Sequence, residues 1–423
     1  MEWLGVVPEH WGVNRFCYLF DENKKKNIGL QETNVLSLSY GNIKEKNIND
    51  NKGLLPESFE TYQIIESNDI VFRFTDLQND KRSLRSAISK YHGIITSAYI
   101  AVKTKENADF YNYLFRAYDL QKVFYSMGEG MRQSLKMDEL NKMPVVLPSK
   151  DEQKRIVSFL DTETARIDNL IAKQEKLIEL LEEQRKSIIS HAVTKGLNPN
   201  APMKDSGVEW LGEVPEHWMT PSSKHLLEIP ITDGPHETPN FVDDGVPFIS
   251  AEAISKGKID FDKKRGYITP ELNAIYSKKY SPKIEDIYMV KSGATTGKVA
   301  MVETTEEFNI WSPLAVFRCN KNKVLPKFLL AVFNSSHFYD ALVLNWSYGT
   351  QQNIGMGVLS NIEIPCPPLK EQAEIIQHLD AQNTKFDKLI STQSQLIEKL
   401  KEYRSSIISH AVTGKIDVRE FGA

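Results

Sequence analysis

The sequence predicts an α+β protein with two globular domains that contain curled mixed sheets, separated by two long antiparallel coiled-coil helices and related by an internal pseudo-two-fold duplication. Three observations support this fold class. One motif occurs near the N-terminus and again in the middle of the chain, a second occurs in the middle and again near the C-terminus, and a heptad pattern precedes each copy of the second. The 423 residues are enough for about three units of roughly 150 residues each.

The repeats define a constant frame around a variable insert. Residues 2–11 recur as residues 209–218, and residues 185–194 recur as residues 404–413, with nine of ten positions identical in each case. The segments between these anchors share only scattered features. We expect two globular domains, two helices, a linker and a tail, with the boundaries 1–147 (first domain), 148–196 (first helix), 197–208 (linker), 209–367 (second domain), 368–415 (second helix) and 416–423 (tail).

The helices are predicted from an apolar repeat of seven in segments that lack proline and glycine. The repeated positions of the first helix are Leu160, Ile167, Gln174, Leu181 and Ile188, with Leu170 and Leu177 at intermediate positions. Those of the second are Leu379, Phe386, Gln393, Leu400 and Ile407, with Leu389, Leu396 and Tyr403 between them. A helix of about 40 residues is roughly 60 Å long, so such a pair suits a spacer.

Gln174 and Gln393 occupy equivalent positions in the two repeats. A polar residue in a coiled-coil seam costs stability but fixes the register, because a slipped pairing buries it without a partner. The alternative is that both glutamines lie at the solvated edge of an ordinary helix pair. The sequence leaves both interpretations open.

Each insert, residues 12–142 and 219–361, alternates short β-type runs with turn residues and ends in a helical pattern. We therefore expect an α+β globule of about 130–150 residues in each half. The inserts also carry small basic clusters, such as Lys278-Lys279 and the pair Lys291 and Lys298. A single cluster is usually a solvated face, but basic and amide side chains on loops are also what phosphate contact and base readout require.

The composition of the chain limits the classes of function and the cellular location that we expect. The net charge of −4 gives no bulk attraction for nucleic acid, so DNA binding would depend on local patches. Cys17, Cys319 and Cys366 form no CxxC motif, which argues against a cysteine zinc site and fits a reducing cytoplasm, with Cys17 and Cys319 expected in the core. No long apolar run indicates a membrane segment. We expect a cytoplasmic protein.

Catalytic signatures are incomplete. Residues 292–299 resemble a phosphate-binding loop, but three residues rather than four separate the glycines, and Val299 replaces the hydroxyl residue that binds magnesium. We interpret this segment as a glycine turn between strands that exposes Lys298. Residues 235–239 lack the second histidine of a zinc-protease helix. We therefore predict that the chain itself is not an enzyme and binds no cofactor.

Several motifs in duplicated order carry a resemblance to a known family. They are the Trp-Leu-Gly-x-x-Pro-x-His-Trp opening of each half, the Asp233-Gly-Pro-His-Glu-Thr-Pro239 segment, the Ser292-Gly-Ala-Thr-Thr-Gly297 turn, the Glu-Gln pairs at 152–153 and 371–372, and the Ser-Ile-Ile-Ser-His-Ala-Val-Thr helix ends. Together they resemble the specificity subunit of type I restriction-modification systems, over essentially the whole chain.

This resemblance implies a non-catalytic DNA-recognition subunit. In this family each target-recognition domain reads one half of a split, asymmetric target in double-stranded DNA, and the helices set the unspecified spacer. Two modification (methyltransferase) subunits dock on it and supply S-adenosylmethionine chemistry, and restriction subunits add ATP- and magnesium-dependent translocation and cleavage. The first insert lacks the Asp-Gly-x-His-x-Thr-Pro segment and has residues 76–85 instead, so it resembles a different domain subtype.

Arginine, lysine and glutamine suit contacts to guanine, phosphate and adenine. The candidate DNA-binding residues are Lys81, Arg82, Arg85, Arg132 and Gln133 in the first domain and His236, Thr238, Lys298, Gln351 and Gln352 in the second. Gln133 and Gln352 have an alternative, structural interpretation as caps of the turn before the last strand. The rival functions are a duplicated coiled-coil scaffold that binds only proteins, and an enzyme with methyl transfer or cleavage in this chain.

Overall fold

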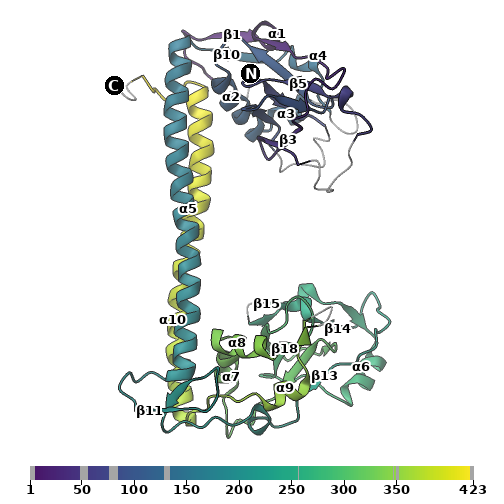
Figure 1. The fold of residues 1–423 in the computed structure, drawn as a ribbon, viewed down its shortest axis with the longest axis vertical. Coiled ribbons are helices and arrows are strands. Elements are labelled where there is room, and N and C mark those ends of the chain that lie inside the picture. Colours follow the sequence, from purple (N-terminus) through teal and green to yellow (C-terminus); the bar gives the residue numbers. More distant parts are fainter. Residues whose placement is uncertain are drawn as a thin grey trace. The chain divides into compact units, whose positions relative to one another are not determined.

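The computed structural model describes residues 5–47, 56–75, 84–127, 134–255, 257–345, 347–348 and 352–419 (Figure 1). The chain forms two compact units. Unit 1 comprises residues 1–175 and 394–423, and unit 2 comprises residues 176–393. Both units contain one globular α+β part and a section of each of two long helices, which is the predicted duplicated fold.

The long helices are α5 (Lys150–Lys195), with 46 residues, and α10 (Leu369–Val412), with 44 residues. Their sequences contain neither proline nor glycine, and each ends shortly before a glycine with positive φ. These are Gly196, with φ of 74°, and Gly414, with φ of 72°. Only glycine adopts this left-handed conformation without strain, so it stops a helix well.

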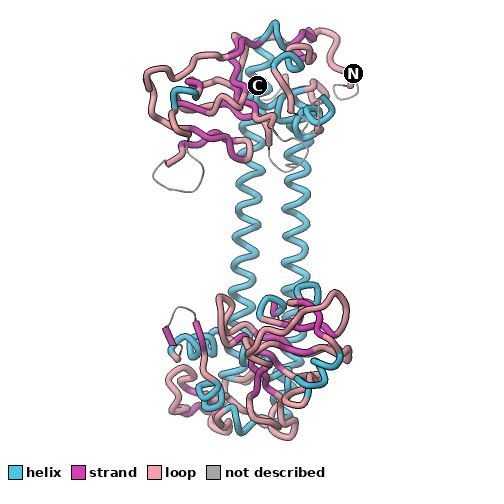
Figure 2. Tube along the Cα trace, turned by 90° about the vertical axis from the view of Figure 1, so that its right-hand side faces the viewer, coloured by secondary structure: helices cyan, strands magenta, loops and turns pink. Residues whose placement is uncertain are grey.

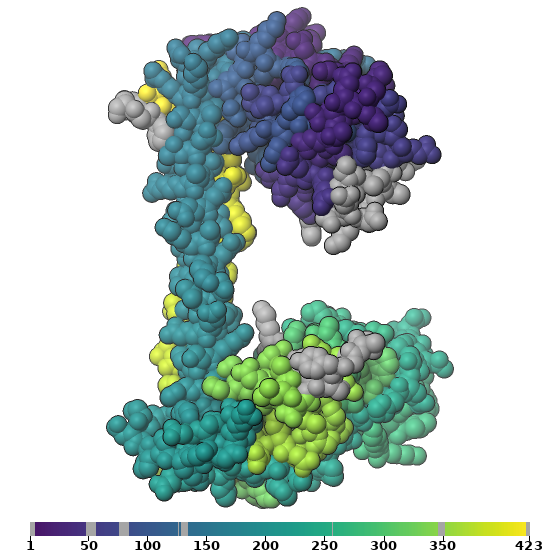
Figure 3. Space-filling view, in the orientation of Figure 1, coloured from purple at the N-terminus to yellow at the C-terminus, as the bar shows by residue number. Residues whose placement is uncertain are grey.

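Within each unit the two helices pack antiparallel. In unit 1 the first turns of α5 share a core with the last turns of α10, through Ile156, Leu160, Ile407 and Ala411. In unit 2 the last turns of α5 share a core with the first turns of α10, through residues 192–193 and 375–379. Figures 2 and 3 show the two helices side by side. The predicted antiparallel pairing is confirmed.

Unit 1 contains short, twisted sheets. Its strands are β1 (Gly12–Arg15), β2 (Phe20–Glu22), β3 (Leu36–Ser39), β4 (Asn42–Glu45), β5 (Gln63–Ile65), β6 (Ile70–Phe72), β7 (Ser86–Ile88), β8 (Gly93–Ile95), β9 (Ile100–Thr104) and β10 (Pro144–Leu147). The largest sheet has the order β2-β9-β6-β7, and β1-β10, β3-β4 and β5-β8 form pairs. These ladders are antiparallel, and a parallel bridge joins Val35 to Ile94.

The helices of unit 1 cover its largest sheet and connect it to the long helices. They are α1 (Phe16–Leu19), α2 (Ala108–Leu120), α3 (Val123–Met127) and α4 (Met137–Leu140). Helix α2 begins at a cap, because the side chain of Asn107 accepts a hydrogen bond from the Phe110 amide. Its buried face contributes Phe110, Leu114 and Phe115 to the core that also contains Leu160 of α5.

Unit 2 has one antiparallel and one mixed main sheet. Its strands are β11 (Met203–Asp205), β12 (Glu213–Pro215), β13 (Thr232–Asp233), β14 (Val246–Ile249), β15 (Ile254–Ser255), β16 (Lys258–Ile259), β17 (Gly266–Ile268), β18 (Ile287–Val290), β19 (Val299–Met301), β20 (Asn309–Ile310), β21 (Leu314–Phe317), β22 (Ser347–Tyr348) and β23 (Gln352–Asn353). The orders are β13-β21-β18-β19 and β17-β14-β20, with β14 and β20 parallel.

The short helices of unit 2 are α6 (Pro270–Ser277), α7 (Pro326–Phe333), α8 (Ser336–Leu344) and α9 (Met356–Asn361). Helix α6 begins where the Thr269 hydroxyl accepts from the Leu272 amide, with Pro270 in the first turn. Helices α7 and α8 pack on the sheet that contains β18 and β21, in one core with Ile375 and Leu379 of α10. The globular part is thus fused to the helix pair.

Candidate nucleic-acid interface and helix junctions

A polar junction joins the N-terminal motif of unit 1 to the start of α5. The Glu152 carboxylate lies 2.7 Å from His10 Nε2 and accepts from Trp11 Nε1 at 3.1 Å and from Ser149 Oγ at 2.8 Å. Burial alone would raise the pKa of Glu152, but these hydrogen bonds outweigh it and lower the pKa to about 2. Gly414, after α10, packs against the Trp11 ring, so one junction ties together both helices and the motif.

Unit 2 repeats this junction with matching distances. Glu371 lies 2.7 Å from His217 Nε2 and accepts from Trp218 Nε1 at 3.1 Å. Gly196, after α5, packs against Trp218 and Glu371. The repeated Trp-Leu-Gly-x-x-Pro-x-His-Trp and Glu-Gln motifs are therefore structural: they fix where each globular part joins the helix pair.

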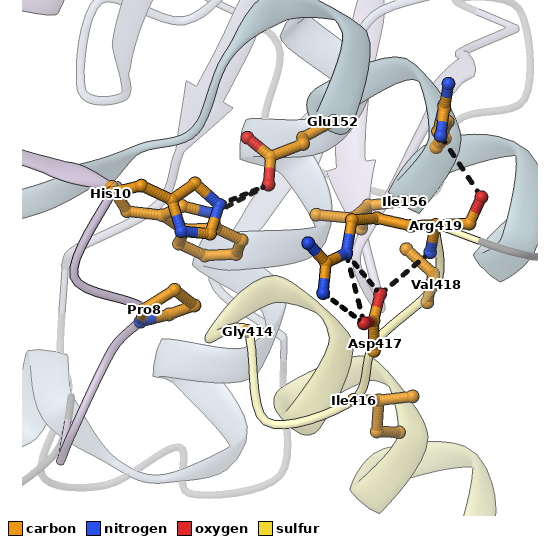
Figure 4. A pocket seen from close by; sticks show the side chains of 11 residues that line it. Pro8, His10, Glu152, Ile156, Gly414, Ile416, Asp417, Val418 and Arg419 are labelled. Carbon is orange, nitrogen blue, oxygen red and sulfur yellow. Dashed lines mark hydrogen bonds and ion pairs between the residues drawn. The ribbon is translucent and has the colours of Figure 1, made fainter.

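A cavity of about 140 Å³ adjoins the unit 1 junction (Figure 4). The segment after α10 closes one side of it, because Arg155 Nη1 donates to the Arg419 carbonyl at 3.1 Å and Val418 is buried. In unit 2 the corresponding hollow is about 550 Å³ and is lined by His217, Glu371 and residues of the predicted linker.

Gln153 and Gln372, next to the junction glutamates, are fully buried. Gln153 Nε2 donates to the Pro148 carbonyl at 2.9 Å, and its Oε1 accepts from the Asn107 amide at 3.0 Å. Gln372 makes the matching bonds to the Pro367 carbonyl and the Leu325 amide, both at 2.8 Å. Asn107 precedes α2 and Leu325 precedes α7. Each glutamine therefore fastens a diverged domain to its helix.

The helix seam differs from the predicted one at every second position. The repeated positions Leu160, Ile167, Leu379, Phe386 and Ile407 are buried, as predicted. The complementary positions follow four residues later, at Ile171, Ile178, Ile390 and Ile397, which are buried or half-buried. The predicted partners three residues later face outward: Leu170, Leu177, Leu389, Leu396 and Tyr403 are 36 to 53% exposed.

Two ion pairs repeat with the internal symmetry. Arg185 Nη2 donates to Asp387 Oδ1 at 2.6 Å in unit 2, and Arg404 Nε donates to Asp168 Oδ1 at 2.8 Å in unit 1. Asp168 and Asp387, like Arg185 and Arg404, are equivalent positions 219 residues apart. Each pair joins α5 to α10, and charge pairs of this kind select the pairing of two helices.

Gln174 and Gln393 are both half-buried. Gln174 Oε1 is buried and accepts no hydrogen bond from the part of the chain that the structure describes. A role in fixing the register stays a prediction for both residues.

In unit 2 the Asp233–Pro239 segment starts at the last residue of β13, close to the end of β18 and the beginning of β21. Gly234 must be glycine, because a Cβ there would lie 2.0 Å from the Ile310 carbonyl oxygen. The Pro235 carbonyl accepts from the Ser312 amide at 3.1 Å. His236 and Thr238 are exposed, and His236 Nε2 lies 3.2 Å from Asp233 Oδ2.

The glycine turn at residues 292–297 joins β18 to β19, as predicted, and Lys298 is exposed beside it. The turn contacts β23: the Gln352 carbonyl accepts from the Gly293 amide at 3.1 Å, and the Lys291 carbonyl accepts from the Ile354 amide at 2.8 Å. The Gln352 side chain is exposed. The structure thus brings the turn and Gln352 together, while Gln351 lies outside the described residues.

None of the candidate DNA-binding residues of the first domain is seen on a described, exposed surface. Lys81, Arg82, Arg132 and Gln133 lie outside the described residues. Arg85 is 0% exposed: its guanidinium donates to the Thr75 carbonyl at 3.2 Å, and its amide donates to Asp119 Oδ2 at 2.5 Å. A base or phosphate contact needs an accessible side chain, so Arg85 is corrected to a core residue.

The remaining chemistry of the described chain is sparse. Cys319 and Cys366 are buried, but Cys17 is exposed, which corrects its predicted core position because it lies on the outward side of the short helix α1. Within the described ranges no three His, Cys, Asp or Glu side chains group as metal ligands. The helices described include none long and apolar enough to cross a membrane.

Comparison with known proteins identifies the family. The family described as "Type I restriction modification DNA specificity domain" matches residues 87–180 and 215–402, which is more than half of the chain. The chain belongs to this family. The predicted resemblance and duplicated fold are thereby confirmed, and the chain is grouped with specificity subunits and not with catalytic ones.

Relatives of this specificity family match along the chain. The type I restriction enzyme MjaVIII specificity subunit of Methanocaldococcus jannaschii is 25% identical, covering 98% of this chain and 94% of its own length. The EcoKI specificity subunit of Escherichia coli is 29% identical over 48% of this chain and 44% of its own length.

Two solved structures share the fold. A chain described under "complex assembly and conformational transition of the type I R-M system" has a TM-score of 0.68 at 16% identity, covering 97% of this chain and 100% of its own. The HsdS subunit from Thermoanaerobacter tengcongensis has a TM-score of 0.51 at 16% identity, covering 97% and 98%.

Proposed function

We propose that this chain is the DNA-recognition subunit of a type I restriction-modification complex and that each unit reads one half of a bipartite, asymmetric target in double-stranded DNA. The observation that carries the proposal is the pair of matched junctions. The same His, Trp, Glu and Gly contacts recur in both units, while the globular parts fastened to them have different sheets. The two junctions are alike, which suits a partner that is present in two copies. The two globular parts differ, which suits a target with two different halves.

The recognition surfaces follow from the predicted domains, 1–147 and 209–367. In unit 2, His236, Thr238, Lys298 and Gln352 are exposed on segments that meet at one end of a sheet, which supports a role in contacting DNA. We add Gln351 to this proposed set because it precedes Gln352 in the sequence. For the first domain the proposed contacts are Lys81, Arg82, Arg132 and Gln133, and Arg85 is left out because it is buried.

Helices α5 and α10 serve as the spacer in this proposal. Each runs unbroken from one unit into the other, so its length constrains the gap between the half-sites. The outward-facing Leu170, Leu177, Leu389 and Leu396 recur at equivalent positions. Exposed leucines on a polar helix surface favour a protein partner. We assign these positions to the docking of two modification subunits.

The catalytic cofactors belong to the partners in this proposal. S-adenosylmethionine binds the modification subunits, and ATP and magnesium bind restriction subunits where these are present. This chain supplies the residues that recognise the DNA target and the surfaces on which the modification subunits dock.

The test is half-site-specific loss of recognition. The chain is co-purified with its modification subunit, and its preferred targets are selected from a random double-stranded library. Gln352→Ala or Lys298→Ala is expected to relax one half-site, and Lys81→Ala or Arg82→Ala the other, because each lost base contact costs about 1–3 kcal/mol of discrimination. Lys105→Ala, at an exposed lysine outside the candidate surfaces, is the control.

Two results would refute the proposal. If the wild-type complex selected no sequence, the chain would be a protein scaffold. If every variant altered both half-sites together, the two units would not read DNA separately.

A further inference from the structure

One carboxylate in unit 2 collects three basic side chains. Lys279 Nζ lies 2.6 Å from Asp233 Oδ1, Lys291 Nζ lies 3.1 Å from Asp233 Oδ2, and His236 Nε2 lies 3.2 Å from the same oxygen. Lys279 follows α6, Lys291 follows β18, and Asp233 ends β13. The fold thus brings three distant segments to one point, which we call the Asp233 cluster.

The cluster is fixed by its surroundings. Asp233 is 6% exposed and the Lys291 side chain 12%, whereas the Lys279 side chain is 52% exposed. Burial alone would raise the pKa of Asp233, but the hydrogen bonds and charges of Lys279 and Lys291 outweigh it and hold the pKa below its ordinary value. Asp233 is therefore an anion that holds two ammonium groups in place.

The charges in the cluster do not cancel. Two lysines face one carboxylate, which leaves one unit of positive charge. The nearby carboxylate of Glu237 accepts from the Tyr276 hydroxyl at 3.3 Å, a contact outside the cluster. A partly buried positive charge with an exposed ammonium at its edge attracts an anion of matching charge.

We propose that the Asp233 cluster binds a single backbone phosphate of the DNA target through Lys279 and Lys291, with Asp233 as the positioning residue. The inference rests on the proposed function and assigns a site to it. Lysine binds phosphate as a point charge, with N···O distances of about 2.7–2.9 Å. The Lys279 ammonium donates to Asp233 and, at 3.4 Å, to the Gly234 carbonyl, so one of its three N–H groups is left for a phosphate oxygen.

The cluster is connected to the candidate base-reading residues. The carbonyl of Lys291 accepts from Ile354, and the next residue but one, Gly293, donates to the carbonyl of Gln352. Phosphate contacts fix the register of a protein on the duplex, and base contacts then specify the sequence. A phosphate held at Lys291 therefore places Gln352 against its base.

Salt dependence of binding tests the inference. Lys279→Met in the full complex is compared with Lys278→Met, which removes the same charge from the neighbouring exposed lysine. Loss of one phosphate contact lowers the slope of log K against log salt by about 0.9. We expect that change and a several-fold loss of affinity, equal for all sequences, for Lys279→Met only.

Asp233→Asn provides the second measurement. We expect it to weaken binding to the specific target while leaving binding to unrelated DNA unchanged or stronger, because the lysines keep their charge but lose their alignment. If Lys279→Met keeps the wild-type slope, or if Lys278→Met lowers it equally, the phosphate site is wrong. If Asp233→Asn and Lys279→Met lower only the melting temperature, the cluster is structural. Failure of the wild-type complex to select a sequence would instead refute the proposed function.

Discussion

The outward-facing leucines of the long helices give the sharpest test of partner docking. Leu177 on α5 and Leu396 on α10 are equivalent in the internal repeat, and each is 39% exposed. Complete burial of a leucine contributes about 1.5–3 kcal/mol. Covering the exposed two-fifths of one side chain therefore contributes about 0.6–1.2 kcal/mol.

Alanine and aspartate substitutions test this estimate at two levels. Leu177→Ala should weaken binding of one modification subunit about three- to sevenfold, since 1.4 kcal/mol corresponds to tenfold. Leu177→Asp should remove that subunit altogether, because an interface would bury an unpaired carboxylate. The double variant with Leu396→Asp should bind no modification subunit. Helix folding should survive, because both positions face solvent in this chain.

The assay is titration of the purified chain with the modification subunit, with mass measured by light scattering. Leu30→Asp, at a half-exposed leucine in a loop of unit 1, is the matched control and should bind two subunits. If Leu177→Asp and the double variant still bind two subunits with wild-type affinity, the docking surface lies elsewhere.

Two further predictions concern the frame. Insertion of one heptad into both helices, after Gln174 and after Gln393, lengthens each by about 10 Å, or about three base pairs. Selection on targets with gaps altered by one to four base pairs should find a new preferred gap with unchanged half-site letters, and altered letters would contradict the spacer. Glu152→Gln should remove a pH dependence of the free energy of unfolding. The pKa of Glu152 is lowered from 4.5 to about 2, so the ionised carboxylate stabilises unit 1 above pH 4.5. This stabilisation is lost as the pH falls towards 2. Urea unfolding between pH 3 and 7 should show about 1–2 kcal/mol of this loss in the wild type; an equal loss in the variant would refute the assignment.

The frame could be predicted from the sequence because its signals are local. Proline and glycine bound the helical segments, and the two long helices predicted with the fold class are present as Lys150–Lys195 and Leu369–Val412. The second seam position could not be predicted, because both Leu170 and Ile171 are apolar. Only the partner helix decides which of them is buried.

The candidate site could not be predicted from the sequence, because its residues come together only in the three-dimensional fold. Lys279 and Lys291 belong to basic clusters in the sequence, but Asp233 lies 46 and 58 residues before them. The strand order β13-β21-β18 brings Asp233 to Lys291, and the segment after α6 brings Lys279 to it. Arg85 follows a basic stretch, which suggests a DNA contact, yet the residue is buried: its backbone amide donates to Asp119 on α2 and its guanidinium donates to the Thr75 carbonyl. Residue type alone does not show that an arginine is buried.

The central claim is that the two units read two different half-sites across a fixed gap. Single-molecule sequencing of DNA methylated by the wild-type complex measures this directly. We predict one motif with two short, unlike half-sites separated by a constant number of unspecified bases. A continuous motif, a palindrome of identical halves, or methylation without a motif would contradict the account.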